Sequence, residues 1–379
     1  MNATVPRLKV LTVVGTRPEI IRLSAVIKRL DEHTDHVLVH TGQNYDYELN
    51  EVFFEDLGLR RPDHFLEADT SSLGAVLGSI LVSIERVLIE ERPDAFLVLG
   101  DTNSSISAVI AKRMKIPVFH MEAGNRSFDE NVPEETNRRL VDHVADYNLV
   151  YTEHARRNLL AEGLHPSRIR LTGSPMKEVL AQNEAGVAAS DVLKREGLAQ
   201  DAFFLVSLHR EENVDHSGRL SSILEGLQSV GDSYDLPVLV STHPRTRNRL
   251  EGLTGSFDRL RFHKPFGFHD YLALQAAARL VLSDSGTIAE ESSLMRFPAV
   301  TLRDAIERPE AEDSGSIILT GASPDAILDA VRVVLGGDGH ASAAVPAGYE
   351  VGDTSYRVLT LLRSLTRTHH ARSGQRMDG

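Results

Sequence analysis

The chain has 379 residues, a formal net charge of −13 and no cysteine. The length suggests two domains, and the acidic balance argues against nonspecific binding to nucleic acid or to an anionic membrane. The lack of cysteine excludes disulfides, cysteine-ligated zinc and cysteine nucleophiles. The first residues lack the apolar core of a signal peptide, and no apolar run is long enough for a transmembrane helix. We therefore expect a cytoplasmic protein.

In the first half of the chain, short apolar runs alternate with longer amphipathic stretches. Such alternation predicts a parallel, doubly wound sheet with helices on its faces. The predicted strands are Leu8–Val14, His36–His40, Ala95–Leu99, Pro117–Met121, Asn148–Tyr151 and Ile169–Leu171. The predicted helices are Glu19–Leu30, Ala75–Glu91 and Ser104–Met114.

The same pattern starts again after residue 200. The predicted strands are Ala202–Leu208, Pro237–Ser241, Leu260–His263, Leu280–Leu282 and Ala299–Leu302. The predicted helices are Arg219–Val230, Tyr271–Ala278, Ile288–Met295, Ala326–Leu335 and Ser355–Thr368.

This order predicts an α/β fold of two Rossmann-like domains that face a central cleft. We expect the domains at residues 1–180 and 181–368, with a final helix that could pack back on the first domain and a disordered tail at residues 369–379. The stretch Gln182–Ser190 has the composition of a linker. Ligands of such folds bind beyond the carboxyl ends of the strands, so the cleft is the expected site.

Polar residues follow three predicted strands of the first half. The first strand runs into Gly15–Glu19, where a glycine turn and a helix start favour an anion and Arg17 adds positive charge. The same run could be an ordinary strand-to-helix turn. Asp101 could take part in chemistry or cap a helix. Glu122 ends a buried strand, where an unpaired carboxylate is costly, so a purely structural explanation fits it less well.

Two further charged runs could belong to a site. The run Pro133–Arg139 places two carboxylates, including Glu134, before two arginines, including Arg138. It could be a solvated helix face or a charge-balanced site. In the second half, the first strand ends in His209 and Arg210. A histidine at a strand end beside acidic residues could titrate near neutral pH, although a single such histidine is often structural.

The run Ser283–Thr287 leads from a strand into the predicted helix Ile288–Met295. Backbone N–H groups at that helix start, together with the Ser285 hydroxyl, could cradle a phosphate. Glu291, one turn further, could accept hydrogen bonds from ribose hydroxyls. A simple helix cap would explain Asp284 or Ser285 but not the whole run.

The sequence contains no Walker loop, kinase signature, G-x-S-x-G elbow or H-E-x-x-H motif, and the 16 histidines lack convincing ligand spacing. We expect neither a metal nor a cofactor. Three carboxylates and a histidine, gathered with arginines, suit proton transfer at carbon coupled to the loss of a phosphate leaving group. Arg17, Arg138 and Arg210 are candidates for stabilising that leaving group.

Seven short motifs occur in register along residues 8–365: GTRPE at Gly15–Glu19, GDTNS at Gly100–Ser104, HMEAGNRS at His120–Ser127, PEETNR at Pro133–Arg138, HREEN at His209–Asn213, SDSG at Ser283–Gly286 and ERPE at Glu307–Glu310. Together they resemble the bacterial non-hydrolysing UDP-N-acetylglucosamine 2-epimerases. The resemblance implies a glycosyltransferase-B-type fold, a homodimer and a UDP-sugar substrate. It implies conversion of UDP-GlcNAc to UDP-ManNAc, by elimination of UDP to give 2-acetamidoglucal and re-addition of UDP.

The resemblance also assigns roles to individual residues. Its catalytic positions match Asp101, Glu122, Glu134 and His209. Its nucleotide-sugar contacts match Arg17, Ser285, Gly286, Glu291 and Arg308. To these we add, as candidate substrate-binding residues, Arg22, Arg138, Arg210, Tyr271 and Thr287. Which carboxylate takes the proton and which returns it stays open.

The chain departs from the family pattern in several places. Many members have lysine where this chain has Arg22, and the phosphate turn reads SDSGT instead of the commoner SGG type. Gln43 and His243 match positions that help to form a second, activating UDP-GlcNAc site in the family, but the neighbouring Asn44 and Asp46 depart from its pattern.

The runs GTRPEIIRLS and GQNYDYELN are similar to a sister branch that epimerises carbon 2 of UDP-2-acetamido-2,6-dideoxy-L-talose to make UDP-N-acetyl-L-fucosamine. The chemistry would be the same with a different sugar. A retaining glycosyltransferase shares the fold but would need an acceptor pocket. A hydrolysing epimerase would release free ManNAc, and a non-catalytic sensor would be expected to lack one of the catalytic-type side chains.

Overall fold

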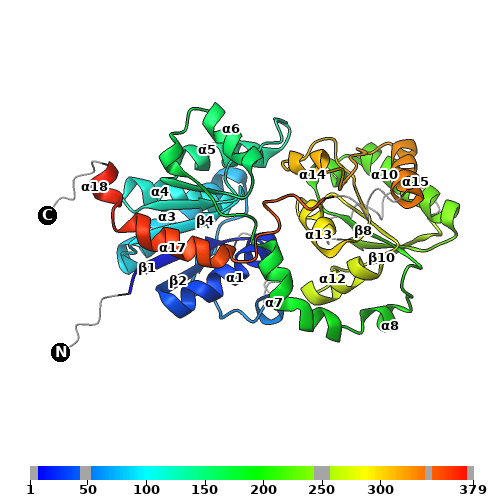
Figure 1. The fold of residues 1–379 in the computed structure, drawn as a ribbon, viewed down its shortest axis with the longest axis horizontal. Helices are drawn as coiled ribbons and strands as arrows, with labels where there is room; N and C mark the ends of the chain where they lie inside the picture. Colours follow the sequence, from blue (N-terminus) through cyan, green and yellow to red (C-terminus); the bar gives the residue numbers. More distant parts are fainter. Residues whose placement is uncertain (1–6, 43–52, 243–256, 338–343, 374–379) are drawn as a thin grey trace. The chain divides into compact units, whose positions relative to one another are not determined.

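The computed structural model describes residues 7–42, 53–242, 257–337 and 344–373 (Figure 1). The chain divides into two compact units. The N-terminal unit contains Met1–Gln182 and Ala347–Gly379, and the C-terminal unit contains Asn183–Pro346. Each unit is built on one sheet in which every strand pair is parallel.

The N-terminal sheet has seven strands in the order β3-β2-β1-β4-β5-β6-β7. Their bounds are β1 (Lys9–Val14), β2 (Asp35–His40), β3 (His64–Phe65), β4 (Ala95–Leu99), β5 (Val118–Met121), β6 (Tyr147–Val150) and β7 (Ile169–Leu171). The strand order reverses between β1 and β4, which pair with Val10 opposite Ala95. Ligands of open α/β sheets bind at such a reversal, so the residues that follow β1 and β4 are placed for function.

The helices of this unit are α1 (Arg17–His33), α3 (Leu73–Glu91), α4 (Ala108–Arg113), α5 (Pro133–Val144), α6 (Glu153–Ala161), α17 (Thr354–Thr366) and α18 (His369–Ser373), with 3₁₀ turns η1 (Asn103–Ser107) and η2 (Pro166–Arg168). Helix α7 (Met176–Ala189) begins in this unit and ends in the C-terminal unit. Helix α17, near the end of the chain, packs against α1, near the start of the chain. The Arg29 side chain donates to the Ser355 hydroxyl across this contact (3.3 Å).

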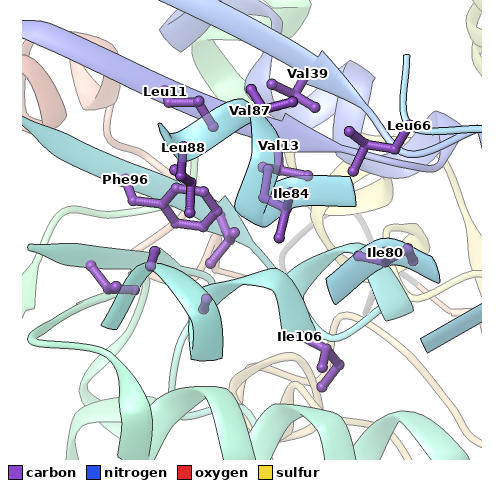
Figure 2. Close-up of a cluster of buried hydrophobic side chains, with 14 of the residues drawn as sticks. Leu11, Val13, Val39, Leu66, Ile80, Ile84, Val87, Leu88, Phe96 and Ile106 are labelled. Atoms are coloured by element: carbon purple, nitrogen blue, oxygen red, sulfur yellow. The ribbon is translucent and has the colours of Figure 1, made fainter. Parts of the chain in front are cut away.

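One face of this sheet is covered by α3, η1 and α4 over a continuous apolar core (Figure 2). Ile80, Ile84 and Leu88 recur at helical spacing on α3 and are buried against the sheet, where Phe96 of β4 is fully buried. Each such side chain contributes about 1.5–3 kcal/mol through its burial. This packing holds β1 and β4 rigidly, and with them the turns at their carboxyl ends.

The C-terminal sheet has five strands in the order β10-β9-β8-β11-β12. The elements are β8 (Phe204–Leu208), β9 (Val238–Thr242), β10 (Leu260–His263), β11 (Leu280–Ser283), β12 (Ala299–Thr301), α8 (Val192–Glu196), α9 (Glu211–Val214), α10 (Ser217–Tyr234), α12 (Phe268–Ala277), α13 (Ile288–Met295), α14 (Pro309–Asp313) and α15 (Pro324–Gly336). The order reverses between β8 and β11, so the segments after these two strands lie side by side.

The structure differs from the sequence prediction at Gln182–Ser190, which is helical as far as Ala189 instead of a linker. Asn183 Oδ1 lies 3.0 Å from Nε2 of His269, and a Cβ on Gly186 would lie 2.5 Å from the same ring. The segment is also rich in residues with good helix propensity. Close packing on His269 therefore fixes a segment whose composition resembles a linker.

Two smaller differences concern a helix and the tail. The predicted helix Ser104–Met114 is split into the 3₁₀ turn η1 and the α-helix α4. Residues 369–373, expected in a disordered tail, form α18. His369 is buried there, with Nδ1 3.2 Å from the Tyr147 hydroxyl, and this contact anchors the segment on β6.

Candidate active site

The turn between β1 and α1 is organised by Glu19. One oxygen of its carboxylate accepts hydrogen bonds from the backbone N–H groups of Gly15 (2.9 Å) and Thr16 (2.7 Å) and from the Thr16 hydroxyl (2.9 Å). Its other oxygen is hydrogen-bonded to the hydroxyl of Ser104, which follows β4. Burial outweighs these bonds and raises the pKa of Glu19 to about 7. Glu19 thus ties the turn that carries Arg17 to the segment after β4.

Glu122 follows β5 and forms an ion pair with Arg22 of α1. Both side chains are buried. Glu122 has a φ of 63°, a left-handed conformation that is unusual for a residue with a side chain. A Cβ added to Gly100 would lie 3.9 Å from the Glu122 carboxylate, so this carboxylate is next to the turn after β4. A charge held in a buried, strained turn is typical of a functional position.

Asp101 is the second candidate acid and forms an ion pair with Arg138 of α5. Arg138 also pairs with Glu135, one turn earlier on the same helix. The Asn137 amide donates to the Asp101 carbonyl (3.0 Å), which fixes the backbone of the turn. Glu134 lies in the first turn of α5 and is partly buried. The run Pro133–Arg139 is therefore a charge-balanced helix start and not a wholly solvated face.

His209 follows β8 in the C-terminal unit, and Asp284 follows the neighbouring β11. Nδ1 of His209 lies 3.0 Å from the Asp284 carboxylate, which also accepts the backbone N–H groups of His209 (3.1 Å) and Arg210 (3.0 Å). Burial alone would raise the pKa of Asp284, but His209 and these bonds hold it below its usual value. An ionised aspartate at Nδ1 fixes the ring tautomer and leaves Nε2 to exchange protons.

Asp284 is a residue that the sequence interpretation treated only as a helix cap. The position of Asp284 would reveal its role, because Asp284 follows β11 and β11 pairs with β8, the strand that precedes His209. Strand order is not visible in a single sequence.

The segment after β11 and helix α13 hold further candidate residues. The hydroxyls of Ser285 and Thr287 are hydrogen-bonded to each other (2.9 Å) just before α13 begins. Glu291 on α13 is buried and accepts a hydrogen bond from Gln275 (2.6 Å). Burial, and then the nearby Glu291 charge, raise the pKa of Tyr271 above its usual range. Tyr271 therefore stays a neutral hydroxyl beside this carboxylate.

Two of the remaining candidate arginines have a carboxylate partner, and Arg17 lies over the Phe53 ring (5.5 Å from its guanidinium carbon to the ring centroid). Arg308 lies 3.0 Å from Glu290 on α13, and both side chains are buried. Arg210 lies 3.9 Å from Glu307. Gly286 sits between Ser285 and Thr287 in the turn before α13. Gln43 and His243 lie outside the described residues.

Within each unit, the structure brings together Arg22 with Glu122, Asp101 with Arg138, and Ser285 with Thr287. Tyr271 is near enough to Glu291 for that charge to raise the pKa of its hydroxyl. Among the residues that the structure describes, no three His, Asp or Glu side chains are grouped so that they could hold a metal ion. Over the same ranges, no helix has both the length and the apolar character to cross a membrane.

Comparison with known proteins gives a consistent result. The sequence model of the family described as UDP-N-acetylglucosamine 2-epimerase matches residues 28–363. The structure of UDP-N-acetylglucosamine 2-epimerase from Rickettsia bellii is similar with a TM-score of 0.92 and 44% identity, and the match covers 98% of this chain and 100% of that one. Methanocaldococcus jannaschii UDP-GlcNAc 2-epimerase in complex with UDP-GlcNAc and UDP is similar with a TM-score of 0.88 and 36% identity, covering 94% and 99%.

A third relative has a different printed substrate. The UDP-2,3-diacetamido-2,3-dideoxy-D-glucuronate 2-epimerase of Pseudomonas aeruginosa is 38% identical, over 87% of this chain and 93% of its own. The α/β class with two Rossmann-like units, predicted from the sequence, is confirmed by these matches and by the two parallel sheets.

Proposed function

The chain belongs to the UDP-N-acetylglucosamine 2-epimerase family, and we propose that it converts UDP-GlcNAc to UDP-ManNAc by inverting carbon 2 of the sugar. The M. jannaschii relative, which covers most of this chain, is described with UDP-GlcNAc and UDP bound. The observation that carries the proposal is the set of charged side chains after the strand ends: Glu122 paired with Arg22, Asp101 paired with Arg138, and His209 paired with Asp284.

The proposed route has two halves that are the reverse of each other. A base removes the proton from carbon 2 while the bond from carbon 1 to the UDP oxygen breaks, which gives 2-acetamidoglucal and UDP. UDP then adds back to carbon 1, and a proton is delivered to the opposite face of carbon 2. Atoms and electrons balance without an oxidant, so the route has no need of a redox cofactor.

Proton removal beside an N-acetyl group needs a base that is held close and shielded from water. Glu122 and Asp101 meet the chemical requirement, because each is a carboxylate held by an arginine in the same unit. Glu134 at the start of α5 is the third candidate acid. We propose that these three carboxylates share removal and return of the proton.

Departure of UDP leaves negative charge on the diphosphate, which cations and backbone N–H groups stabilise. Arg210, Arg308 and the N-terminus of α13 are our candidates for that role. Of the other arginines that the sequence suggested for it, Arg138 is instead paired with Asp101, and Arg17 is kept as a substrate contact. We assign the proton exchange with the leaving diphosphate to His209, because Asp284 fixes its ring and leaves Nε2 available. Arg17, Tyr271, Thr287 and Glu291 complete the proposed substrate contacts.

Proton NMR in deuterated water tests this function directly. The purified protein is mixed with UDP-GlcNAc without added metal or nicotinamide nucleotide, and carbon 2 is followed with time. We expect deuterium at carbon 2 and a growing UDP-ManNAc signal. Release of free ManNAc would instead identify a hydrolysing enzyme, and the absence of both exchange and product would exclude UDP-GlcNAc as the substrate.

A different UDP-sugar is the second candidate substrate. The P. aeruginosa relative, at 38% identity, is described as acting on a diacetamido glucuronate, so relatives this similar differ in the sugar. UDP-2-acetamido-2,6-dideoxy-L-talose, suggested by the sequence, needs the same inversion at carbon 2. Running the deuterium experiment with each sugar at equal concentration ranks them by the rate of exchange.

We also propose that the chain forms a homodimer in the cytoplasm. Val82 and Ile89 are two helical turns apart on α3, and more than half of each side chain is exposed. We take these two exposed apolar side chains as the candidate contact with a second copy of the chain. Light scattering should give twice the chain mass for the natural sequence and the single mass for the Val82→Glu, Ile89→Glu double variant.

A further inference from the structure

A fully buried histidine, His120, lies between the two turns that carry candidate acids. It is on β5, and its Nε2 atom lies 2.7 Å from the carbonyl oxygen of Gly100, directly after β4. Its Nδ1 atom lies 2.9 Å from a carboxylate oxygen of Asp142 on α5. One ring therefore links the carbonyl that precedes Asp101 to a buried carboxylate.

Asp142 extends this link to the turn after β5. Its two carboxylate oxygens lie 3.1 and 3.2 Å from the backbone nitrogen of Gly124, which donates to them. Arg126 donates to the same carboxylate (2.7 Å). Burial alone would raise the pKa of Asp142, but His120 and Arg126 hold it below its usual value. The carboxylate is therefore ionised and held from three sides.

Both turns pass through left-handed conformations, and the turn at Glu122 needs such support. Gly100 and Gly124 have φ values of 71° and 80°, and Glu122 has a φ of 63°. A left-handed residue with a side chain costs about 1–3 kcal/mol and persists only where its surroundings fix it. A Cβ on Gly124 would lie 2.3 Å from the carbonyl oxygen of Ala155, so this turn is also pressed against α6.

We infer that His120 and Asp142 are positioning residues for the epimerisation, which set the separation of the turn before Asp101 from the turn at Glu122. This inference rests on the proposed function. Neither residue touches the reacting atoms in this account. Their effect is on the geometry of two carboxylates, and a displacement of about 1 Å can lower a rate about 100-fold.

The chain offers a matched control in His36. Its side chain is also buried and lies between a carboxylate and a neutral oxygen, with Nδ1 2.6 Å from Asp31 and Nε2 2.9 Å from the Thr12 hydroxyl. His36 lies near the start of β2, whereas Gly100 follows the end of β4. In a parallel sheet these two positions are at opposite strand ends. Loss of this ring removes a similar set of contacts from the same unit at a place without candidate acids.

The experiment compares His120→Phe with His36→Phe, which keep a ring and lose both contacts. We expect His120→Phe to lower kcat by about 10- to 100-fold with KM changed less than about threefold, because the proposed nucleotide contacts of the C-terminal unit stay in place while the carboxylates shift. His36→Phe should change kcat less than about twofold at a comparable loss of Tm. His120→Gln, which can still donate to Gly100, should recover part of the activity.

Amide hydrogen exchange gives a readout that needs no turnover. In His120→Phe and in Asp142→Asn, exchange should rise at residues 100–103 and 122–126, and His36→Phe should leave these segments unchanged. Unchanged exchange there would overturn the link between the turns, even if the natural protein proves inactive on UDP-GlcNAc. Raised exchange with undiminished kcat would overturn the positioning role. If His120→Phe does not fold, His120→Gln and Asp142→Asn decide both points.

Discussion

The buried carboxyl of Glu19 should make the stability of the fold depend on pH between about 5 and 8. Burial raises the pKa of Glu19 from its ordinary 4.5 to about 7 in the folded protein. Glu19→Gln removes the titration while imitating the protonated acid. Its amide oxygen can still accept from the N–H groups of Gly15 and Thr16, and its amide nitrogen can donate to Ser104.

The size of the effect follows from the pKa difference. A group with a raised pKa binds its proton more tightly in the folded state, so it stabilises the fold fully below pH 4.5. That contribution is lost as the pH rises through 7. At about 1.4 kcal/mol for each unit of pKa, the full contribution is about 3 kcal/mol. About 2.5 kcal/mol of it lies between pH 5 and pH 8.

Urea unfolding followed by circular dichroism at several pH values measures this quantity. The free energy of unfolding of the natural protein, minus that of Glu19→Gln, should fall by about 2–3 kcal/mol from about pH 5 to pH 8. The subtraction removes other groups that titrate in both proteins. A difference that stays constant with pH would refute the reasoning. A difference that grows with pH would mean that the hydrogen bonds to Glu19 outweigh its burial.

Further expected outcomes concern turnover. Glu122→Gln and His209→Ala should each lower kcat at least about 100-fold in the deuterium assay, the scale of acid–base groups, and near-natural rates in either would contradict the assignment. Asp284→Asn should lower kcat by about 100- to 1,000-fold with unchanged circular dichroism, because the amide no longer fixes the His209 tautomer; a loss confined to KM would exclude that role. Arg22→Lys should keep much of the activity if UDP-GlcNAc is the substrate, and its complete loss would show that the guanidinium is required.

Elements with clear boundaries in the sequence could be predicted from it. The strands Ala95–Leu99 and Leu260–His263 and the helix Ile288–Met295 have the predicted bounds, and a glycine or proline follows each of them within three residues. Predicted boundaries are wrong where tertiary packing, and not the local sequence, determines where an element ends. Helix α7 runs to Ala189 through a segment whose composition suggests a linker, since contact with His269 holds it.

The sequence could indicate single candidate residues after individual strands, but not which of these residues lie together. Asp101 and Glu122 stand out because each follows an apolar strand. Their partners Arg138 and Arg22 lie 37 and 100 residues away in the chain. The two turns approach each other only because β4 and β5 are neighbours in the sheet. Strand order, and therefore every ion pair between strand ends, depends on packing that a single sequence does not reveal.

The ion pairs also explain how a chain with a net charge of −13 could serve an anionic substrate. Arg22, Arg138 and Arg308 are all buried, and each is paired with a carboxylate. A buried arginine without such a partner would be strongly destabilising, so the acidic residues are what allow cations to be kept at these positions. Because Glu290 already holds the Arg308 guanidinium in place, little reorganisation is needed at this candidate diphosphate contact, and preorganised charge of this kind supplies much of the stabilisation of a developing anion. The net charge of −13 is therefore compatible with the proposed chemistry, because local pairing decides where the cations lie.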